Sequence, residues 1–362
     1  MPAKGGSGVR APRFTPGCGY NPWFMSDSRG ERFRVAVVGF GRAGAVHAQA
    51  WRDCFGVEVA GACDPDPAAR RRAAELGIPA FSDLDEMLEA TRPDAVSVCT
   101  PPACHGELAA RCLKRGLHVL CEKPLTTDLA SAQQLWNVAE QANRSLLVAA
   151  KYRHVPELRM AREMLRCGEI GAVKVFRIEF AAPVPMATRW NAKRAISGGG
   201  VIMDNGWHAF DLIHFLFGGI LTVRARARNG PQGFDVEESA WIDVVAAGGE
   251  TGQVVLSWST PAGRDAYVWI RGERGDIHVG WKGSRLERDA AAPVAFGQPY
   301  DKADAHRRMM ASFREVVTGR QQPWLSREES LGIAAAIEAA YRSCASQSEE
   351  PVGEPLGAAA AD

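Results

Sequence analysis

The feature that most constrains the fold is the alternation of short apolar runs with helical segments between residues 33 and 150. Val-rich runs that are apolar at every position are typical of strands buried on both faces of a sheet. The segments between them have helical spacing and end in glycine. This alternation predicts βαβ units and a doubly wound parallel α/β sheet. The runs are RVAVVGF, VEVAGACD, AVSVCT, HVLCEKP and SLLVAA.

A second pattern begins near residue 156, where one helix is followed by longer strands such as VKVFRIEF and TGQVVLSWS. Their alternation of apolar and polar residues predicts a mainly antiparallel open sheet with one face covered. The run TVRARAR places three arginines on one face, which we interpret as solvated, with a subunit contact as the alternative. The last helical segment begins with a capping box formed by Ser326 and Glu329.

Length and composition exclude several classes of protein. A chain of 362 residues is long enough for two domains. Its 43 basic and 42 acidic side chains are nearly balanced, which argues against a general binder of nucleic acid or membrane surfaces. It has no apolar run of about 18 residues, so we expect no membrane span. Nine cysteines without a C-x-x-C pair indicate a reduced, cytoplasmic protein.

The segment from Gly39 to Gly44 matches the pattern G-x-G-x-x-G, and it lies between a predicted strand and a helix. In such a loop the first glycine permits a tight turn and the third lets helix and strand pack closely. The second, here Gly41, lets the backbone approach a pyrophosphate at the helix N-terminus. The loop therefore predicts dinucleotide binding.

Asp64 closes the next strand, where an acidic side chain would bind the ribose hydroxyls. Its charge would repel a 2′-phosphate, so we expect NAD, with NADP as the alternative. Arg70, Arg71 and Arg72 follow closely and could pair with such a phosphate, although we interpret them as a solvated helix face.

Two further segments contain candidate catalytic groups. Lys123 follows a strand in Cys121–Pro124, at the edge where parallel strands place their ligands. Asp204 and His208 are four residues apart after a glycine-rich segment, which puts both on one helix face. A carboxylate beside an imidazole raises its basicity and suits a general base. The alternatives are a core histidine, a helix cap, or a metal pair, which has no clear third ligand.

The motifs GFGRAG, EKP and GGGVIMDNGWHAFDLIHFLFG together resemble the Gfo/Idh/MocA family of NAD(P)-dependent oxidoreductases. The resemblance runs from about Arg34 to about Ser343 and includes TPPACH, KYRHVP and AIEAAYRS. It implies a Rossmann domain followed by an α/β domain whose open antiparallel sheet often mediates oligomers. It also implies that Pro124 follows a cis peptide bond.

The resemblance implies roles for individual residues. Lys123 would lie beside the substrate hydroxyl and the nicotinamide, and His208 would take or return the carbinol proton, with Asp204 completing the catalytic set. The implied cofactor site comprises Gly39, Phe40, Gly41, Arg42, Ala43, Gly44, Asp64, Thr100, Pro101, Pro102, His105, Glu122 and Lys123. The implied substrate contacts are Lys123, Arg153, Trp190, Asn191, Asp204, Asn205 and His208.

The expected activity is hydride transfer between nicotinamide C4 and a secondary alcohol or ketone of a sugar, aminosugar or cyclitol, as in inositol dehydrogenases. A nucleotide-sugar 3-dehydrogenase or a deoxysugar ketoreductase is the alternative, and a non-catalytic dinucleotide-binding regulator is a third hypothesis. The expected partners are a small polyol or sugar and further copies of the chain, as a homodimer or homotetramer through the C-terminal sheet. No metal, nucleic acid or membrane partner is expected.

These sequence patterns predict four segments. Residues 1–32 form a disordered tail and residues 33–150 a Rossmann dinucleotide-binding domain. Residues 151–344 form a substrate and oligomerisation domain, whose closing helix at 326–344 is expected to pack back on the first domain. Residues 345–362 form a second disordered tail.

Overall fold

The structure, a computed structural model, describes residues 32–230 and 232–353. Almost all of the predicted N-terminal tail and the last nine residues lie outside this part. Among the described residues, no helix is both long and apolar enough to cross a membrane.

The first sheet has six parallel strands in the order β3-β2-β1-β4-β5-β6. Chain order reverses between β1 and β4, as in a doubly wound dinucleotide fold. The expected parallel sheet is therefore confirmed, although β3, with only two residues, was not predicted. The strands are β1 (Phe33–Val38), β2 (Val57–Cys63), β3 (Ala80–Phe81), β4 (Ala95–Val98), β5 (His118–Cys121) and β6 (Leu146–Val148); the helices are α1 (Arg42–Arg52), α2 (Pro67–Glu75), α3 (Leu84–Thr91), α4 (Pro102–Lys114) and α5 (Leu129–Gln141).

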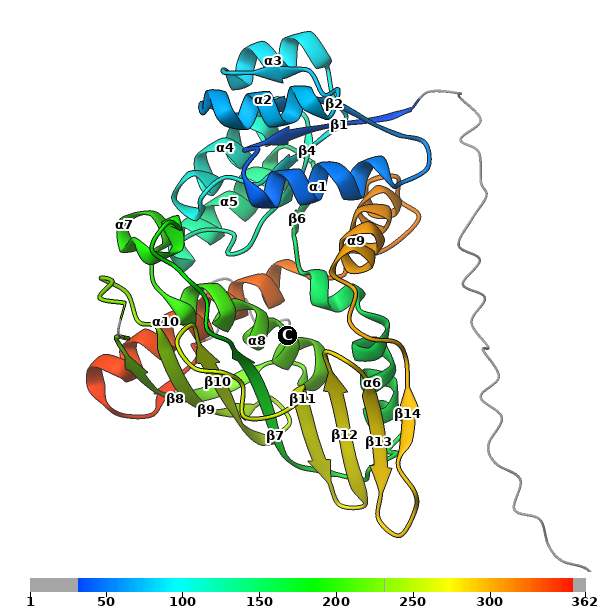
Figure 1. Ribbon diagram of the computed structural model, residues 1–362, viewed down its shortest axis with the longest axis vertical. Helices are drawn as coiled ribbons and strands as arrows, with labels where there is room; N and C mark the ends of the chain where they lie inside the picture. Colours follow the sequence, from blue (N-terminus) through cyan, green and yellow to red (C-terminus); the bar gives the residue numbers. More distant parts are fainter. Residues whose placement is uncertain (1–31, 231, 354–362) are drawn as a thin grey trace, which may run out of the picture. The chain divides into compact units, whose positions relative to one another are not determined.

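Helix α9 (Lys302–Val317) belongs to the packing of this first sheet, although its residues fall within the predicted second domain. Its Met309, Met310 and Phe313 are fully buried in one apolar cluster with Val35 of β1 and Trp51 of α1. The Phe313 and Trp51 rings lie 5.7 Å apart, edge to face. Figure 1 shows α9, in orange, beside the blue helix α1.

The second sheet has nine strands in the order β14-β13-β12-β11-β7-β10-β9-β8-β15. All neighbours are antiparallel except β7 and β10, which agrees with the predicted mainly antiparallel sheet. Helices α8 (Val201–Phe217) and α10 (Arg327–Ser346) pack against β8, β9 and β10 (Figure 1). The strands are β7 (Val173–Ala181), β8 (Ile220–Arg228), β9 (Ser239–Ala246), β10 (Thr251–Ser257), β11 (Ala266–Gly272), β12 (Gly275–Gly280), β13 (Ser284–Arg288), β14 (Val294–Phe296) and β15 (Glu350–Pro351).

The last two segments differ in part from the prediction. Helix α10 packs back on α5, where Trp136 donates a hydrogen bond of 3.3 Å to Ser330. The predicted tail at 345–362 begins too early, because α10 continues to Ser346 and β15 pairs with β8. The polar composition of this stretch concealed the backbone pairing that orders it. Four further helices complete the described chain: η1 (Lys151–His154) and α6 (Pro156–Arg166) follow β6, and η2 (Trp190–Ala192) and α7 (Arg194–Ser197) follow β7.

Candidate active site

The three glycines of the loop after β1 have distinct surroundings. Gly39 has a φ of +87°, which favours glycine. A Cβ on Gly44 would lie 2.0 Å from the Gly39 carbonyl oxygen, so no side chain fits there. A Cβ on Gly41 would meet nothing within 4 Å. Open space therefore adjoins the backbone at the start of α1, where Arg42 and Ala43 begin the first turn, and this arrangement fits a pyrophosphate.

Asp64 lies at the end of β2 and contacts this loop directly. One carboxylate oxygen accepts a hydrogen bond of 2.7 Å from the Phe40 backbone N–H, and the other accepts one from Asp66. Arg70 donates to the carbonyls of Asp64 and Pro65. Arg72 donates to the Phe40 carbonyl at 3.3 Å. Arg72 therefore binds the glycine loop and Arg70 the backbone after β2, so these two side chains do not only face solvent.

The TPPACH segment connects β4 to α4 and lies against the catalytic loop. Pro101 caps α4 and Pro102 begins it. The buried His105 ring contacts two carbonyl oxygens, that of Pro124 at 2.8 Å and that of Thr100 at 2.7 Å. Within the described part of the chain, the buried Thr100 hydroxyl has no hydrogen-bond partner, which leaves it available to a cofactor.

The side chains of Lys123, which follows β5 of the first sheet, and Asp204, on helix α8 beside the second sheet, are in direct contact. The Lys123 ammonium forms an ion pair with one Asp204 carboxylate oxygen and donates a hydrogen bond of 3.1 Å to the Asp204 backbone carbonyl. The Asn191 amide donates to the other carboxylate oxygen at 3.2 Å. The Lys123–Pro124 peptide is cis. Three residues predicted for the site therefore lie in direct contact.

The glycine-rich segment before Asp204 is held by a buried glutamate. Glu237 accepts hydrogen bonds from the N–H groups of Gly200 and Ile202, at the start of α8. The Tyr341 hydroxyl of α10 donates 2.7 Å to the same carboxylate. A Cβ on Gly200 would lie 2.0 Å from the Glu237 carbonyl oxygen, so this close approach requires glycine.

His208 lies one turn further along α8, buried among aromatic rings. The Tyr152 ring is 5.0 Å away, edge to face, and the Trp207 and Phe180 rings also contact it. Burial, followed by the charges of Lys123 and Lys151, holds the pKa of His208 well below its usual value. The imidazole is therefore neutral near pH 7 and can accept a proton.

The expectation that Asp204 raises the basicity of His208 is wrong. The carboxylate is bound by Lys123 and Asn191, and no hydrogen bond joins it to His208 among the described residues. His208 Nδ1 is buried there without a partner. Helical spacing puts the two residues on one face, but the neighbouring domain provides the ion-pair partner of the acid.

The placement of Arg153 corrects its predicted role as a substrate contact. Its side chain is 3% exposed and pairs with the fully buried Asp211 at 2.6 Å. It also donates a hydrogen bond of 2.9 Å to the Glu329 carboxylate and one of 2.7 Å to the Trp324 carbonyl, both near the start of α10. The guanidinium is thus enclosed by protein groups, and we assign it a structural role.

The other predicted substrate contacts have varied surroundings. The Asn205 amide donates 3.2 Å to the Phe180 carbonyl at the end of β7. Trp190 is 37% exposed and lies beside Asn191 in η2, where its ring is available to a ligand. Trp207, which is not among the predicted contacts, is buried and packs against His208, so it belongs to the core.

A buried polar cluster behind Lys123 was not predicted from the sequence. Glu122 accepts hydrogen bonds of 3.0 Å from the His47 ring and from the Lys123 backbone N–H. One potential ligand atom of each of His47, Glu122 and His306 lies within 4.8 Å of the others. Both oxygens of the single carboxylate are already bound, and the positive charges of Lys123 and Lys151 also act on it. This charge balance favours a hydrogen-bonded support for Lys123 over a divalent-cation site.

Two family models match the chain. Residues 33–150 match the oxidoreductase family with an NAD-binding Rossmann fold, and residues 158–278 match the GFO/IDH/MocA C-terminal domain. The first range has the bounds predicted for the dinucleotide-binding domain.

The chain is similar to the rhizopine catabolism protein MocA of Rhizobium meliloti, with 36% identity over 190 residues, 52% of this chain and 58% of that protein. It is also 25% identical to an inositol 2-dehydrogenase of Rhizobium meliloti, over 86% of this chain and 97% of that protein. Among solved structures, GenD2 from gentamicin A biosynthesis, in complex with NAD, is 26% identical with a TM-score of 0.75, over 89% of this chain and 96% of that chain. The matching domains and the relatives agree with the site: the chain belongs to the Gfo/Idh/MocA family of oxidoreductases, with an NAD-binding Rossmann domain at residues 33–150.

Proposed function

We propose that this protein oxidises or reduces a secondary alcohol or ketone of a sugar, aminosugar or cyclitol with NAD as its cofactor. The observation that supports this most strongly is the Lys123–Asp204 ion pair at the end of β5, with His208 one turn further along α8. An ammonium and a neutral imidazole can together bind a hydroxyl and move its proton. NAD(H), when bound, supplies the hydride acceptor or donor at nicotinamide C4.

Each residue has a separate task in this proposal. The Lys123 ammonium, oriented by Asp204, donates a hydrogen bond to the carbinol oxygen. The neutral His208 ring accepts the hydroxyl proton during oxidation and returns it during reduction. Asn191 holds the second Asp204 oxygen, and Glu122 binds the Lys123 backbone, so that the ammonium stays in place. The surrounding aromatic rings exclude water from His208.

The test uses purified protein with NAD and NADP against a panel of sugars, aminosugars and inositols. Lys123→Ala and His208→Ala are expected to bind NADH normally and to lose about 10²-fold or more in kcat, as for a general acid–base group. Lys174→Ala is the control, because this exposed lysine pairs with Glu273. A near-normal kcat in either active-site variant would remove its assigned role. Tight NADH binding with no turnover of any panel member would favour the regulator.

We also propose that the protein is cytoplasmic. We further propose that the face of the second sheet not covered by α8 and α10 joins subunits into a homodimer or homotetramer. Alternate β8 residues, Arg224 and Arg226, are exposed, and Arg228 lies 5.8 Å from the ring of the partly exposed Trp241 on β9. This combination of an aromatic ring and arginines is typical of interfaces. Light scattering after gel filtration tests the proposal; Trp241→Glu should give monomers, and a monomeric wild type would refute it.

A further inference from the structure

Lys151 is a half-buried lysine that the proposed mechanism does not use. It begins η1, three residues after β6 ends, and therefore follows the same sheet edge as Lys123. Its Nζ lies 5.0 Å from the centre of the Tyr152 ring. Apart from this cation–π contact, the ammonium has no hydrogen-bond or ion-pair partner among residues 32–230 and 232–353. An ammonium held partly out of water without a direct ion-pair partner is unfavourable.

Lys151 shares its surroundings with the catalytic groups. The Tyr152 ring beneath its ammonium is the same ring that packs 5.0 Å from the His208 ring. Burial first, and then the positive charge of Lys123, lowers the pKa of Lys151 to about 8. The ammonium of Lys151 therefore lies close to the groups that would move the substrate proton.

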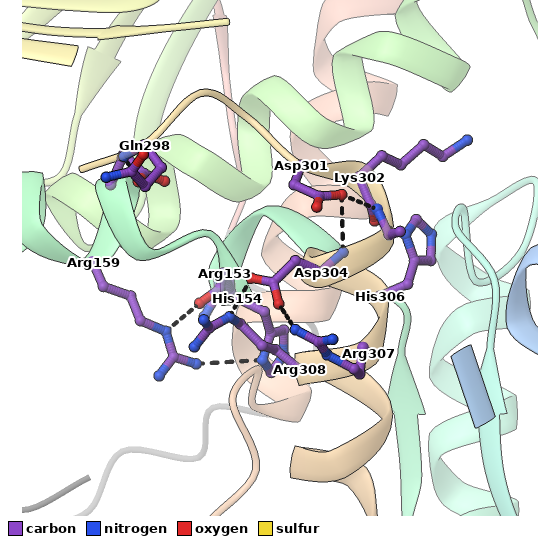
Figure 2. Close-up of polar contacts among 12 residues, drawn as sticks. Arg153, His154, Arg159, Gln298, Asp301, Lys302, Asp304, His306, Arg307 and Arg308 are labelled. Atoms are coloured by element: carbon purple, nitrogen blue, oxygen red, sulfur yellow. Dashed lines mark hydrogen bonds and ion pairs between the residues drawn. The ribbon is translucent and has the colours of Figure 1, made fainter. Parts of the chain in front are cut away.

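The carboxylates around Lys151 are already bound by other groups. Both oxygens of Glu122 accept hydrogen bonds, and both oxygens of Asp204 are bound by Lys123 and Asn191. The acids at the start of α9 are also engaged (Figure 2): Asp301 caps the helix, and Asp304 pairs with Arg307 and Arg308. Lys302, also at this helix start, adds a further positive charge. The charges of Glu122 and Asp204 offset part of the Lys151 charge from a distance, but no acid in the described part of the chain forms an ion pair with its ammonium.

We propose that Lys151 binds an anionic oxygen group of the substrate, so that the enzyme acts on an acidic sugar or polyol in preference to a neutral one. This inference rests on the proposed function and specifies its substrate class. The group is a carboxylate or a phosphate, because both accept charge-assisted hydrogen bonds from an ammonium. Such a bond makes the acid bind about 10- to 100-fold more tightly than its neutral counterpart.

The test measures binding to protein saturated with NADH, which occupies the cofactor's own phosphate sites. Isothermal titration compares D-gluconate with D-glucitol, and D-glucuronate and D-glucose 6-phosphate each with D-glucose. Tighter binding of the two carboxylates identifies sugar acids, whereas tighter binding of the phosphate alone identifies sugar phosphates. If no acid binds more tightly than its neutral counterpart, the inference is overturned.

Variants then assign the preference to Lys151. Lys151→Met should reduce the acid-to-neutral affinity ratio about 10- to 100-fold, Lys151→Arg should largely keep it, and Lys174→Met should leave it unchanged. A ratio that survives in Lys151→Met refutes the assignment, and the comparison of acids in the wild type stands even if this variant does not fold. Turnover of neutral sugars without acid preference would refute only this inference. A lack of turnover with every sugar would refute the proposed function, while the binding ratio still tests Lys151.

Discussion

Alanine substitutions at Gly41 and Gly44 should both weaken NADH binding while changing stability in opposite directions. A methyl group on Gly44 would lie 2.0 Å from the Gly39 carbonyl oxygen and 3.3 Å from the Val37 side chain. The loop must move to accept it, and overpacking of this kind costs about 1–3 kcal/mol or more. At Gly41, φ is −72° and an added Cβ would meet no atom within 4 Å. Alanine there should stabilise the protein by about 0.4–1 kcal/mol, because it makes the unfolded chain less flexible.

The assay for this pair combines urea unfolding with a fluorescence titration of NADH. The methyl group of Gly41→Ala projects into the space that the pyrophosphate would occupy, so the NADH Kd should rise at least about tenfold, which corresponds to about 1.4 kcal/mol. Gly44→Ala should bind weakly because its loop is displaced. Wild-type NADH affinity in Gly41→Ala would refute the placement of the pyrophosphate, and an equal loss of stability in both variants would refute the packing argument.

Two further substitutions test other contacts of the structure. Arg153→Met leaves the buried Asp211 unpaired, so the free energy of unfolding should fall by about 3–5 kcal/mol. The double variant Arg153→Met/Asp211→Leu should recover much of that loss. An unchanged stability with a raised substrate KM would instead restore Arg153 as a substrate contact. Asp64→Asn keeps an acceptor for the Phe40 N–H but removes the negative charge. The ratio of NADPH affinity to NADH affinity should therefore rise about tenfold. An unchanged ratio would show that Asp64 does not face the ribose.

The sequence predicts those parts of the fold that depend on local patterns. Runs apolar at every position identify five strands of the first sheet, but β3 has two residues, too few for any periodicity to appear. The loop from Gly39 to Gly44 is recognisable because Gly39 and Gly44 satisfy local steric requirements, while Gly41 leaves open space at the helix start. Helical spacing likewise places Asp204 and His208 on one face of α8.

The errors at the site involve partners that are distant in sequence. Arg153 resembles a substrate contact until the fold brings Asp211 and Glu329, which are 58 and 176 residues away, against its guanidinium. Lys151 resembles any surface lysine in a short turn. Only the three-dimensional arrangement reveals that its neighbouring carboxylates are bound elsewhere. The sequence therefore identifies which groups are present, whereas the contacts determine which of them remain available to a substrate.

The low pKa of His208 and the unpaired Lys151 are connected. Apart from burial, the charges of Lys123 and Lys151 are the main causes that depress the pKa of His208. A substrate anion at Lys151 would offset part of that charge, so the pKa of His208 should rise when an acidic substrate binds and the imidazole should become a stronger base. Because kcat reports the bound enzyme and kcat/KM the free enzyme, the acidic limb of kcat for sugar oxidation should lie at higher pH than that of kcat/KM. For a neutral substrate, or for an acidic one with Lys151→Met, the two limbs should lie closer together. Coincident limbs with an acidic substrate in the wild-type enzyme would contradict this electrostatic link.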